Sequence, residues 1–244
     1  MKKLFAMTAL ILACHAQADN KLFLFTEQFP PYNMTLDGRP FAHDAEEIGG
    51  LCTDMVKEII QKVPYEVKIK LRNWSFGLDR VKRKPNHGIY CAARTEEREA
   101  WFEWVGPLTN IGWTLFSQPE SNITLNSLAD AKKYEIGGYK GDVMTNYLLE
   151  QGFNVSVINN DALNPRRLQL GQIDLWVSDE LAGPYTASDA VNMDPRKVLT
   201  FKNTPLYLAL NKDTDPKMVA ALQKAAQELI ADGTFAAIEN LYGR

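Results

Sequence analysis

The sequence has few of the residues that metal and nucleophilic chemistry use. It contains three cysteines and three histidines, and the histidines do not stand at zinc-ligand spacing. P-loop, G-x-S-x-G and H-E-x-x-H segments are absent. Basic residues do not outnumber acidic ones, since the formal net charge is −3, and a nucleic-acid binder usually carries a basic excess. We therefore expect no metal, no cofactor and no nucleic-acid partner.

Long apolar runs are confined to the N-terminus. A positively charged start, Met1–Lys3, precedes the apolar run Leu4–Ala13, and Ala16–Ala18 form a small-x-small cleavage site. This order predicts a signal peptide over residues 1–18 and export to the periplasm. No later stretch approaches the eighteen apolar residues of a membrane span. We therefore expect none in the mature chain.

The cysteines divide between the predicted leader and the mature chain. Cys14 loosely resembles the lipobox of bacterial lipoproteins, but the bulky Leu12 departs from that pattern. Lipid anchoring at Cys14 is therefore the lesser alternative to a soluble exported protein. Cys52 and Cys91 remain after cleavage, and such a pair favours a disulfide in an oxidising compartment. Two separately buried thiols are the alternative that the sequence leaves open.

The composition, 45% hydrophobic and 23% charged, is that of a folded protein long enough for two lobes. Period and turn signals predict strands over 21–26, 66–71, 87–92, 134–138, 153–158 and 173–177. They predict helices over 51–62, 78–84, 142–151, 161–170, 215–231 and 234–241. This alternation indicates an α/β protein with parallel sheets and right-handed crossovers.

Two further extended runs, 112–117 and 204–210, interrupt the alternation and are candidate crossing strands between two lobes. The first lobe would comprise residues 19–111 plus 204–244, and the second residues 112–203. We expect a ligand cleft between these lobes, because open α/β sheets place ligands at such crevices.

Several short motifs follow one another along the mature chain. They are Phe29-Pro30-Pro31-Tyr32, Gly49-Gly50-Leu51, Ala93-Arg94-Thr95-Glu96-Glu97-Arg98, Gly106-Pro107-Leu108, Gly137 to Gly141, Gly171-Gln172-Ile173-Asp174, Ser178-Asp179-Glu180 and Ala231-Asp232-Gly233. In this order the chain resembles the type II periplasmic solute-binding proteins. Specifically, it resembles the bacterial extracellular solute-binding family 3 of polar amino-acid ABC transporters. The resemblance implies a two-lobed fold with a ligand cleft between lobes that two strands join.

The resemblance assigns opposite charges of a ligand to two residues. Arg98 would hold the carboxylate, and a guanidinium suits that role because its paired donors match a carboxylate. The alternative is a solvated charge on a helix surface. Asp179 would receive the α-ammonium group, and its alternative role is to cap the following helix.

Other positions would line the cleft. Phe29 occupies the stacking position of the family, and Trp74 is either a pocket wall or a core residue. Ala93 and Asp142 depart from the Ser or Thr found in many members. Asp142 and Glu27 make the expected pocket acidic, which favours a ligand that has an extra positive group or lacks a carboxylate. Capping of a helix by Asp142 accounts for part of this pattern.

We therefore expect a monomeric periplasmic binding protein without enzymatic activity. It would capture a small polar solute, an amino acid or related amine, for an inner-membrane ABC permease. One alternative is an enzyme of the same fold, similar to the cyclohexadienyl dehydratases, in which acids such as Glu27 or Asp179 transfer protons. Another is a binder that presents its ligand to a membrane sensor.

Overall fold

The computed structural model describes residues 21–243, so the predicted signal peptide and Cys14 lie outside the described residues. Its strands are β1 Lys21–Thr26, β2 Met34–Thr35, β3 Ile48–Gly49, β4 Glu66–Leu71, β5 His87–Ala93, β6 Phe102–Ser117, β7 Ile136–Tyr139, β8 Val155–Ile158, β9 Leu175–Asp179 and β10 Arg196–Asn211. Its α-helices are α1 Leu51–Gln61, α2 Trp74–Arg83, α3 Glu96–Glu99, α4 Val143–Glu150, α5 Asn164–Gln169, α6 Ala182–Val191, α7 Pro216–Ala231 and α8 Thr234–Leu241. Short 3-10 helices cover Ala45–Glu47, Leu128–Lys133 and Asp161–Leu163. The predicted α/β alternation is confirmed.

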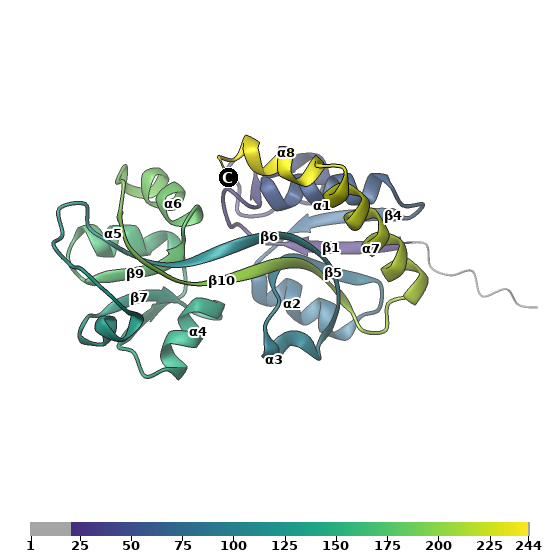
Figure 1. Ribbon diagram of the computed structural model, residues 1–244. Coiled ribbons are helices and arrows are strands. Elements are labelled where there is room, and N and C mark those ends of the chain that lie inside the picture. The colour runs from purple at the N-terminus through teal and green to yellow at the C-terminus, as the bar shows by residue number, and fades with distance from the viewer. Residues whose placement is uncertain (1–20, 244) are drawn as a thin grey trace, which may run out of the picture.

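The strands form two parallel groups joined by two long antiparallel strands. Within the described residues the main sheet has the order β4-β1-β5-β10-β6-β9-β7-β8. β1 is parallel to β4 and β5, and β7 is parallel to β8 and β9. β6 and β10 pair with each other in antiparallel register and pass from one group to the other (Figure 1). The molecule is therefore two-lobed, with two crossing strands.

The crossing strands are longer than predicted. The runs 112–117 and 204–210 are parts of β6 and β10, which have 16 residues each. The proposed lobe boundaries fall inside these strands at facing positions, because Ile111 pairs with Thr204 and Gly112 with Asn203. The helices α7 and α8, which end the described chain, pack beside α1 on the first lobe (Figure 1).

Two helices differ from the prediction because of glycine and proline. α2 begins at Trp74 rather than near residue 78, since Gly77 lies inside it. A Cβ at Gly77 would lie 3.1 Å from Phe25 and from Ile89, so the glycine permits close packing on the sheet. α6 was not predicted over its range, because Gly183 and Pro184 are typical of loops, although proline is tolerated in a first helical turn.

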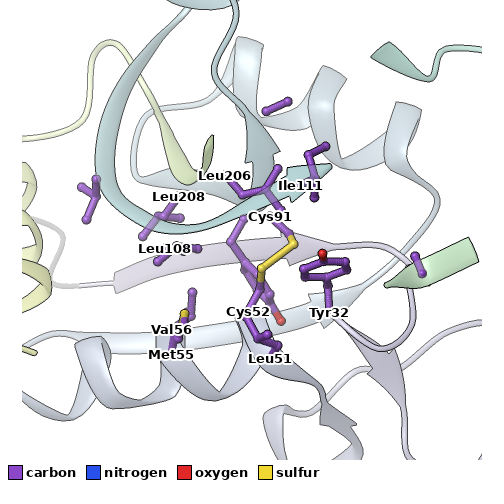
Figure 2. Packing of buried hydrophobic residues seen from close by; sticks show 14 of the residues in the cluster. Tyr32, Leu51, Cys52, Met55, Val56, Cys91, Leu108, Ile111, Leu206 and Leu208 are labelled. Atoms are coloured by element: carbon purple, nitrogen blue, oxygen red, sulfur yellow. A yellow bond between two sulfur atoms is a disulfide. The ribbon is translucent and has the colours of Figure 1, made fainter. Parts of the chain in front are cut away.

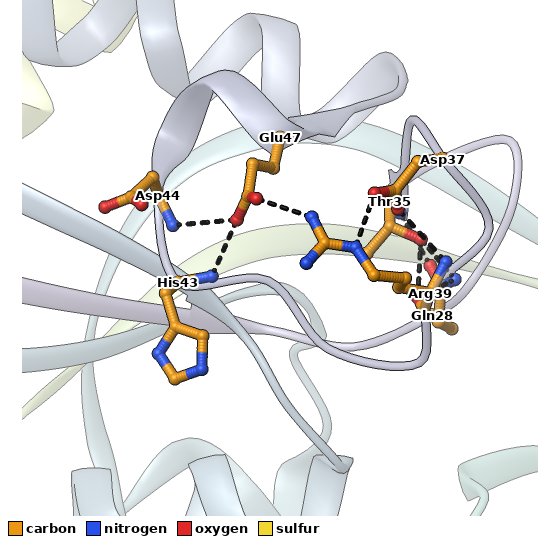
Figure 3. A network of polar contacts seen from close by, with 7 residues as sticks. All are labelled: Gln28, Thr35, Asp37, Arg39, His43, Asp44 and Glu47. Atoms are coloured by element: carbon orange, nitrogen blue, oxygen red, sulfur yellow. Dashed lines mark hydrogen bonds and ion pairs between the residues drawn. The ribbon is translucent and has the colours of Figure 1, made fainter.

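The segment after β1 is fixed by a polar network on the surface of the first lobe (Figure 3). Arg39 donates to Asp37 and to Glu47, each at 2.5 Å. The Gln28 amide bonds the Thr35 backbone and side chain at 2.8 and 2.9 Å. This network holds the loop that carries Phe29 and Tyr32 toward the second lobe. No helix among the described residues is long and apolar enough to cross a membrane.

Candidate functional site

A cavity lies between the two lobes beside the crossing strands. Its empty volume is about 430 Å³, including its opening to solvent. It is lined by Glu27, Phe29, Trp74, Cys91, Ala93, Arg98, Ile111, Tyr139, Gly141, Asp142, Val143, Met144 and Leu206. Six predicted site residues therefore meet there: Glu27, Phe29, Trp74, Ala93, Arg98 and Asp142. Asp179 does not line the cavity.

Arg98 presents a buried guanidinium to the cavity. It lies in the short helix α3, whose N-cap Thr95 accepts from the Arg98 backbone N–H at 3.4 Å. The residue is only 8% exposed, and burial is the main cause that lowers the pKa of its guanidinium. Its guanidinium carbon lies 5.6 Å from the ring centre of Trp74. Among residues 21–243 no hydrogen bond or ion pair satisfies this guanidinium, so its donors remain available to a ligand.

Glu27 is the acidic counterpart of Arg98 in the same cavity. It follows β1, and none of the described residues donates a hydrogen bond to its carboxylate. Burial, and next the charge of Asp142, raise the pKa of Glu27 to about 8. No ion pair joins Glu27 to Arg98 in the described chain, although Arg98 lowers the Glu27 pKa electrostatically. The cavity thus holds separated positive and acidic groups, an arrangement that suits a zwitterion.

Asp142 both caps a helix and lines the cavity. As N-cap of α4, its Oδ2 accepts from the Thr145 backbone N–H at 2.7 Å and from the Thr145 hydroxyl at 2.9 Å. Burial raises the pKa of Asp142, while the bonds from Thr145 act in the opposite direction. The capping role considered from the sequence is therefore present, and the carboxylate still adds acidic character to the cavity.

Asp179 has a different environment from the one the resemblance implies. Its side chain is fully buried, and four groups donate to it: the Tyr32 hydroxyl at 2.8 Å and the backbone N–H groups of Gly112, Leu181 and Ala182 at 2.9, 2.9 and 3.0 Å. A carboxylate offers about four acceptor positions. The structure places Asp179 outside the cavity with its acceptors occupied, and the bonds from Leu181 and Ala182 agree with the capping alternative.

Two aromatic residues of the cavity wall come from the first lobe. Phe29 lines the cavity and stacks on Tyr32 with ring centres 5.1 Å apart and planes 12° apart. Trp74 begins α2 and lies beneath Arg98. The structure therefore places Trp74 at the cavity, where it also packs against a cluster containing Phe25.

Cys91 is joined to Cys52 by a disulfide, which confirms the predicted pairing (Figure 2). Cys91 occupies a β-bulge: Tyr90 pairs with Leu208 and Ala92 with Tyr207, so Cys91 has no opposite residue in the register. Its φ is +62°, in the left-handed region that non-glycine residues rarely adopt. Bulges re-aim side chains, and this one directs Cys91 toward α1 and the cavity wall.

Several lining residues were not predicted, and most of them are apolar. Ile111 and Leu206 come from the crossing strands, and Val143 and Met144 from the start of α4. Tyr139 also lines the cavity, where burial, and next Glu27, raise its pKa well above the usual value. The sequence signal for Tyr139 is the segment Gly137 to Gly141, which is one of the motifs that carry the family resemblance. The described residues hold no cluster of three or more His, Cys, Asp or Glu suited to a metal ion.

The two lobes, the crossing strands and the charged cavity between them define a two-lobed binding-protein fold. The chain belongs to the bacterial extracellular solute-binding proteins, family 3, whose pattern it matches over residues 24–244. The family and the disulfide both indicate an extracytoplasmic protein, because disulfides persist in oxidising compartments. None of the curated proteins matches the chain.

Solved structures share this fold at low sequence identity. A histidine kinase sensor domain with similarity to periplasmic binding proteins has a TM-score of 0.81 at 17% identity, covering 92% of this chain and 96% of that one. The arginine-, lysine-, histidine-binding protein ArtJ of Geobacillus stearothermophilus has a TM-score of 0.75 at 15% identity, covering 92% and 96%. An ancestral amino-acid-binding protein, a precursor of cyclohexadienyl dehydratase, has a TM-score of 0.76 at 16% identity, covering 92% and 96%.

Proposed function

We propose that this protein captures a small zwitterionic solute, an amino acid or related amine, in the cavity between its lobes. The observation that carries the proposal is the guanidinium of the buried residue Arg98 in one cavity with the carboxylate of Glu27, neither of which has a hydrogen-bond partner among residues 21–243. A buried charge without a partner is costly, so a ligand carboxylate at Arg98 would remove that cost. A ligand cation would do the same for ionised Glu27.

The division of roles within the cavity differs from the one predicted from the sequence. Asp179 already accepts four hydrogen bonds, so the amine of the solute is assigned to Glu27 and Asp142. Phe29 and Trp74 would enclose the apolar part of the solute. Ala93 offers no side-chain donor, which leaves Arg98 as the main carboxylate ligand. Two acids against one base favour a solute with an additional positive group.

The biological setting follows from the same proposal. Residues 1–18 would direct export to the periplasm, where the mature chain would act as a monomer. It would pass its solute to an inner-membrane ABC permease. Membership of an extracellular solute-binding family supports this setting.

A thermal-shift screen over amino acids, amines and organic acids tests the proposal. A ligand at 100 times its Kd stabilises the native state by about 2.7 kcal/mol. For a protein of this size, that corresponds to a Tm rise of about 5–11 °C. We expect compounds with both a carboxylate and an amine to give the largest shifts. A flat response across the panel would contradict the proposal.

One observation supports a second candidate, a dehydratase. Burial raises the pKa of Glu27 to about 8, and a carboxyl group that stays protonated near neutral pH can act as a general acid. Incubation with prephenate or arogenate tests this candidate. Release of an aromatic product by the wild type, lost in Glu27→Gln, would support it.

A further inference from the structure

The buried contact between Tyr32 and Asp179 joins the two lobes outside the ligand cavity. Tyr32 follows β1, and Asp179 ends β9. The strands β5, β10 and β6 lie between β1 and β9 in the sheet. The Tyr32 hydroxyl nevertheless donates to Asp179 Oδ1 at 2.8 Å, and both residues are completely buried. The bond therefore spans the junction at which the lobes would separate.

The other bonds of Asp179 stay within its own part of the molecule. Leu181 and Ala182 begin the chain that leads into α6, and Gly112 lies on β6 at the proposed lobe boundary. A rotation of one lobe about the crossing strands would leave these three bonds intact. Of the four bonds to Asp179, it would break the one from Tyr32.

Tyr32 is held firmly on the first lobe. Its backbone N–H donates to Phe29 O at 2.9 Å, and its carbonyl accepts from the N–H of Cys52 at 2.8 Å. Its ring stacks on Phe29, a residue of the cavity wall. A second contact runs alongside, because the Tyr185 hydroxyl of α6 lies 3.6 Å from Met34 Sδ. The hydroxyl of Tyr32 is thus fixed relative to one lobe and its acceptor relative to the other.

We propose that the Tyr32–Asp179 hydrogen bond is an interlobe latch that holds the ligand-free protein closed. Asp179 then acts on the conformation of the cavity rather than on the solute itself. Hydrogen bonds to charged groups are among the stronger ones in proteins. Loss of this one is expected to shift the ratio of closed to open protein about 10- to 150-fold toward open. Tyr32 and Asp179 are positioning residues in this proposal.

Small-angle X-ray scattering of the ligand-free protein tests the latch. Tyr32→Phe removes the hydroxyl and leaves Asp179 with three backbone donors, so the variant is expected to fold. The matched control is Tyr242→Phe, because the Tyr242 hydroxyl donates to Asp54 Oδ2 at 2.7 Å within the first lobe. Both variants lose one tyrosine–aspartate bond. Only Tyr32→Phe is expected to increase the radius of gyration.

Two results would overturn the proposal. The first is an equal radius of gyration for the wild type and Tyr32→Phe, whether both are closed or both are open. The second is an equal increase in Tyr242→Phe, which would indicate general loosening. If circular dichroism shows that Tyr32→Phe does not fold, Tyr32→Leu replaces it. That variant also removes the hydroxyl and leaves Asp179 with its three backbone donors, so we expect the same opening, and an unchanged radius would equally refute the latch.

Discussion

Replacing Arg98 with methionine should change ligand affinity and protein stability in opposite directions. Methionine keeps an unbranched side chain against Trp74 and removes the guanidinium. In the structure Arg98 is 8% exposed, and none of the described residues accepts from its guanidinium. With a carboxylate bound, the same group would make the main charge-assisted contact. Without ligand, Arg98→Met therefore removes the energetic cost of an unpaired buried charge. With ligand, it removes the contact with the ligand carboxylate.

The two magnitudes follow from this environment. Truncating one partner of a buried, hydrogen-bonded charge pair costs about 2–5 kcal/mol, so affinity should fall at least about 30-fold. An unsatisfied buried polar group costs about 1–3 kcal/mol, and the opening of the cavity to solvent favours the lower end. A gain of about 1 kcal/mol would raise the Tm of the ligand-free protein by about 2–4 °C.

Calorimetric binding and thermal unfolding of the same variant provide the measurement. The control is Arg94→Met, because Arg94 lies nearby on the surface and pairs with Glu99 at 2.5 and 2.7 Å. That variant should keep wild-type affinity and lose at most about 1 kcal/mol of stability, as exposed ion pairs do. Unchanged affinity in Arg98→Met, or a lower ligand-free Tm, would refute the reasoning about this site.

Three further outcomes are expected from the remaining groups. Burial raises the pKa of Glu27 from 4.5 to about 8, so the stability of the ligand-free protein should fall as pH increases between these two values. Over the same pH range the affinity for a cationic solute should rise. Glu27→Gln should remove most of both pH dependences, with stability measured as Tm and affinity measured by calorimetry. The Cys52–Cys91 disulfide joins residues 39 positions apart, so its reduction should lower the free energy of unfolding, measured in urea, by about 4 kcal/mol. The stability of a Cys52→Ser, Cys91→Ser variant should not change when reductant is added. Asp142→Asn keeps an oxygen that can accept from the Thr145 N–H, so the free energy of unfolding should change by only a few tenths of a kcal/mol. The same variant should bind cationic solutes more weakly. A large loss of stability would contradict this expectation and show that the Asp142 charge supports the fold.

The sequence was sufficient to predict the architecture, because the signals involved are local. Turn residues and apolar periodicity located most strands and helices, and the motif order identified the two-lobed family. β6 and β10 were predicted too short, since residues such as Asn110 and Asn203 interrupt the apolar pattern but lie where the strands cross between lobes. Their pairing over 16 residues is set by tertiary contacts rather than by propensity.

Part of the cavity lining was predicted from the sequence for a related reason. Six of the seven ligand residues expected from the sequence line one cavity, because their motifs lie at strand ends that open on the cleft. Asp179 also ends a strand, but no pattern in the sequence around it shows that its carboxylate accepts a hydrogen bond from Tyr32. That contact joins residues 147 positions apart. Pairings across the lobes depend on how two folded halves meet, which local residue patterns do not encode.

The position of β10 has a consequence for how the chain folds. β10 begins at Arg196 of a 244-residue sequence, yet it lies in the middle of the sheet, between β5 and β6. A chain emerging from the ribosome therefore cannot assemble the centre of its sheet until β10 has been made. Contacts between such distant segments slow folding. The late arrival of this central strand would therefore keep the nascent polypeptide from completing its sheet early.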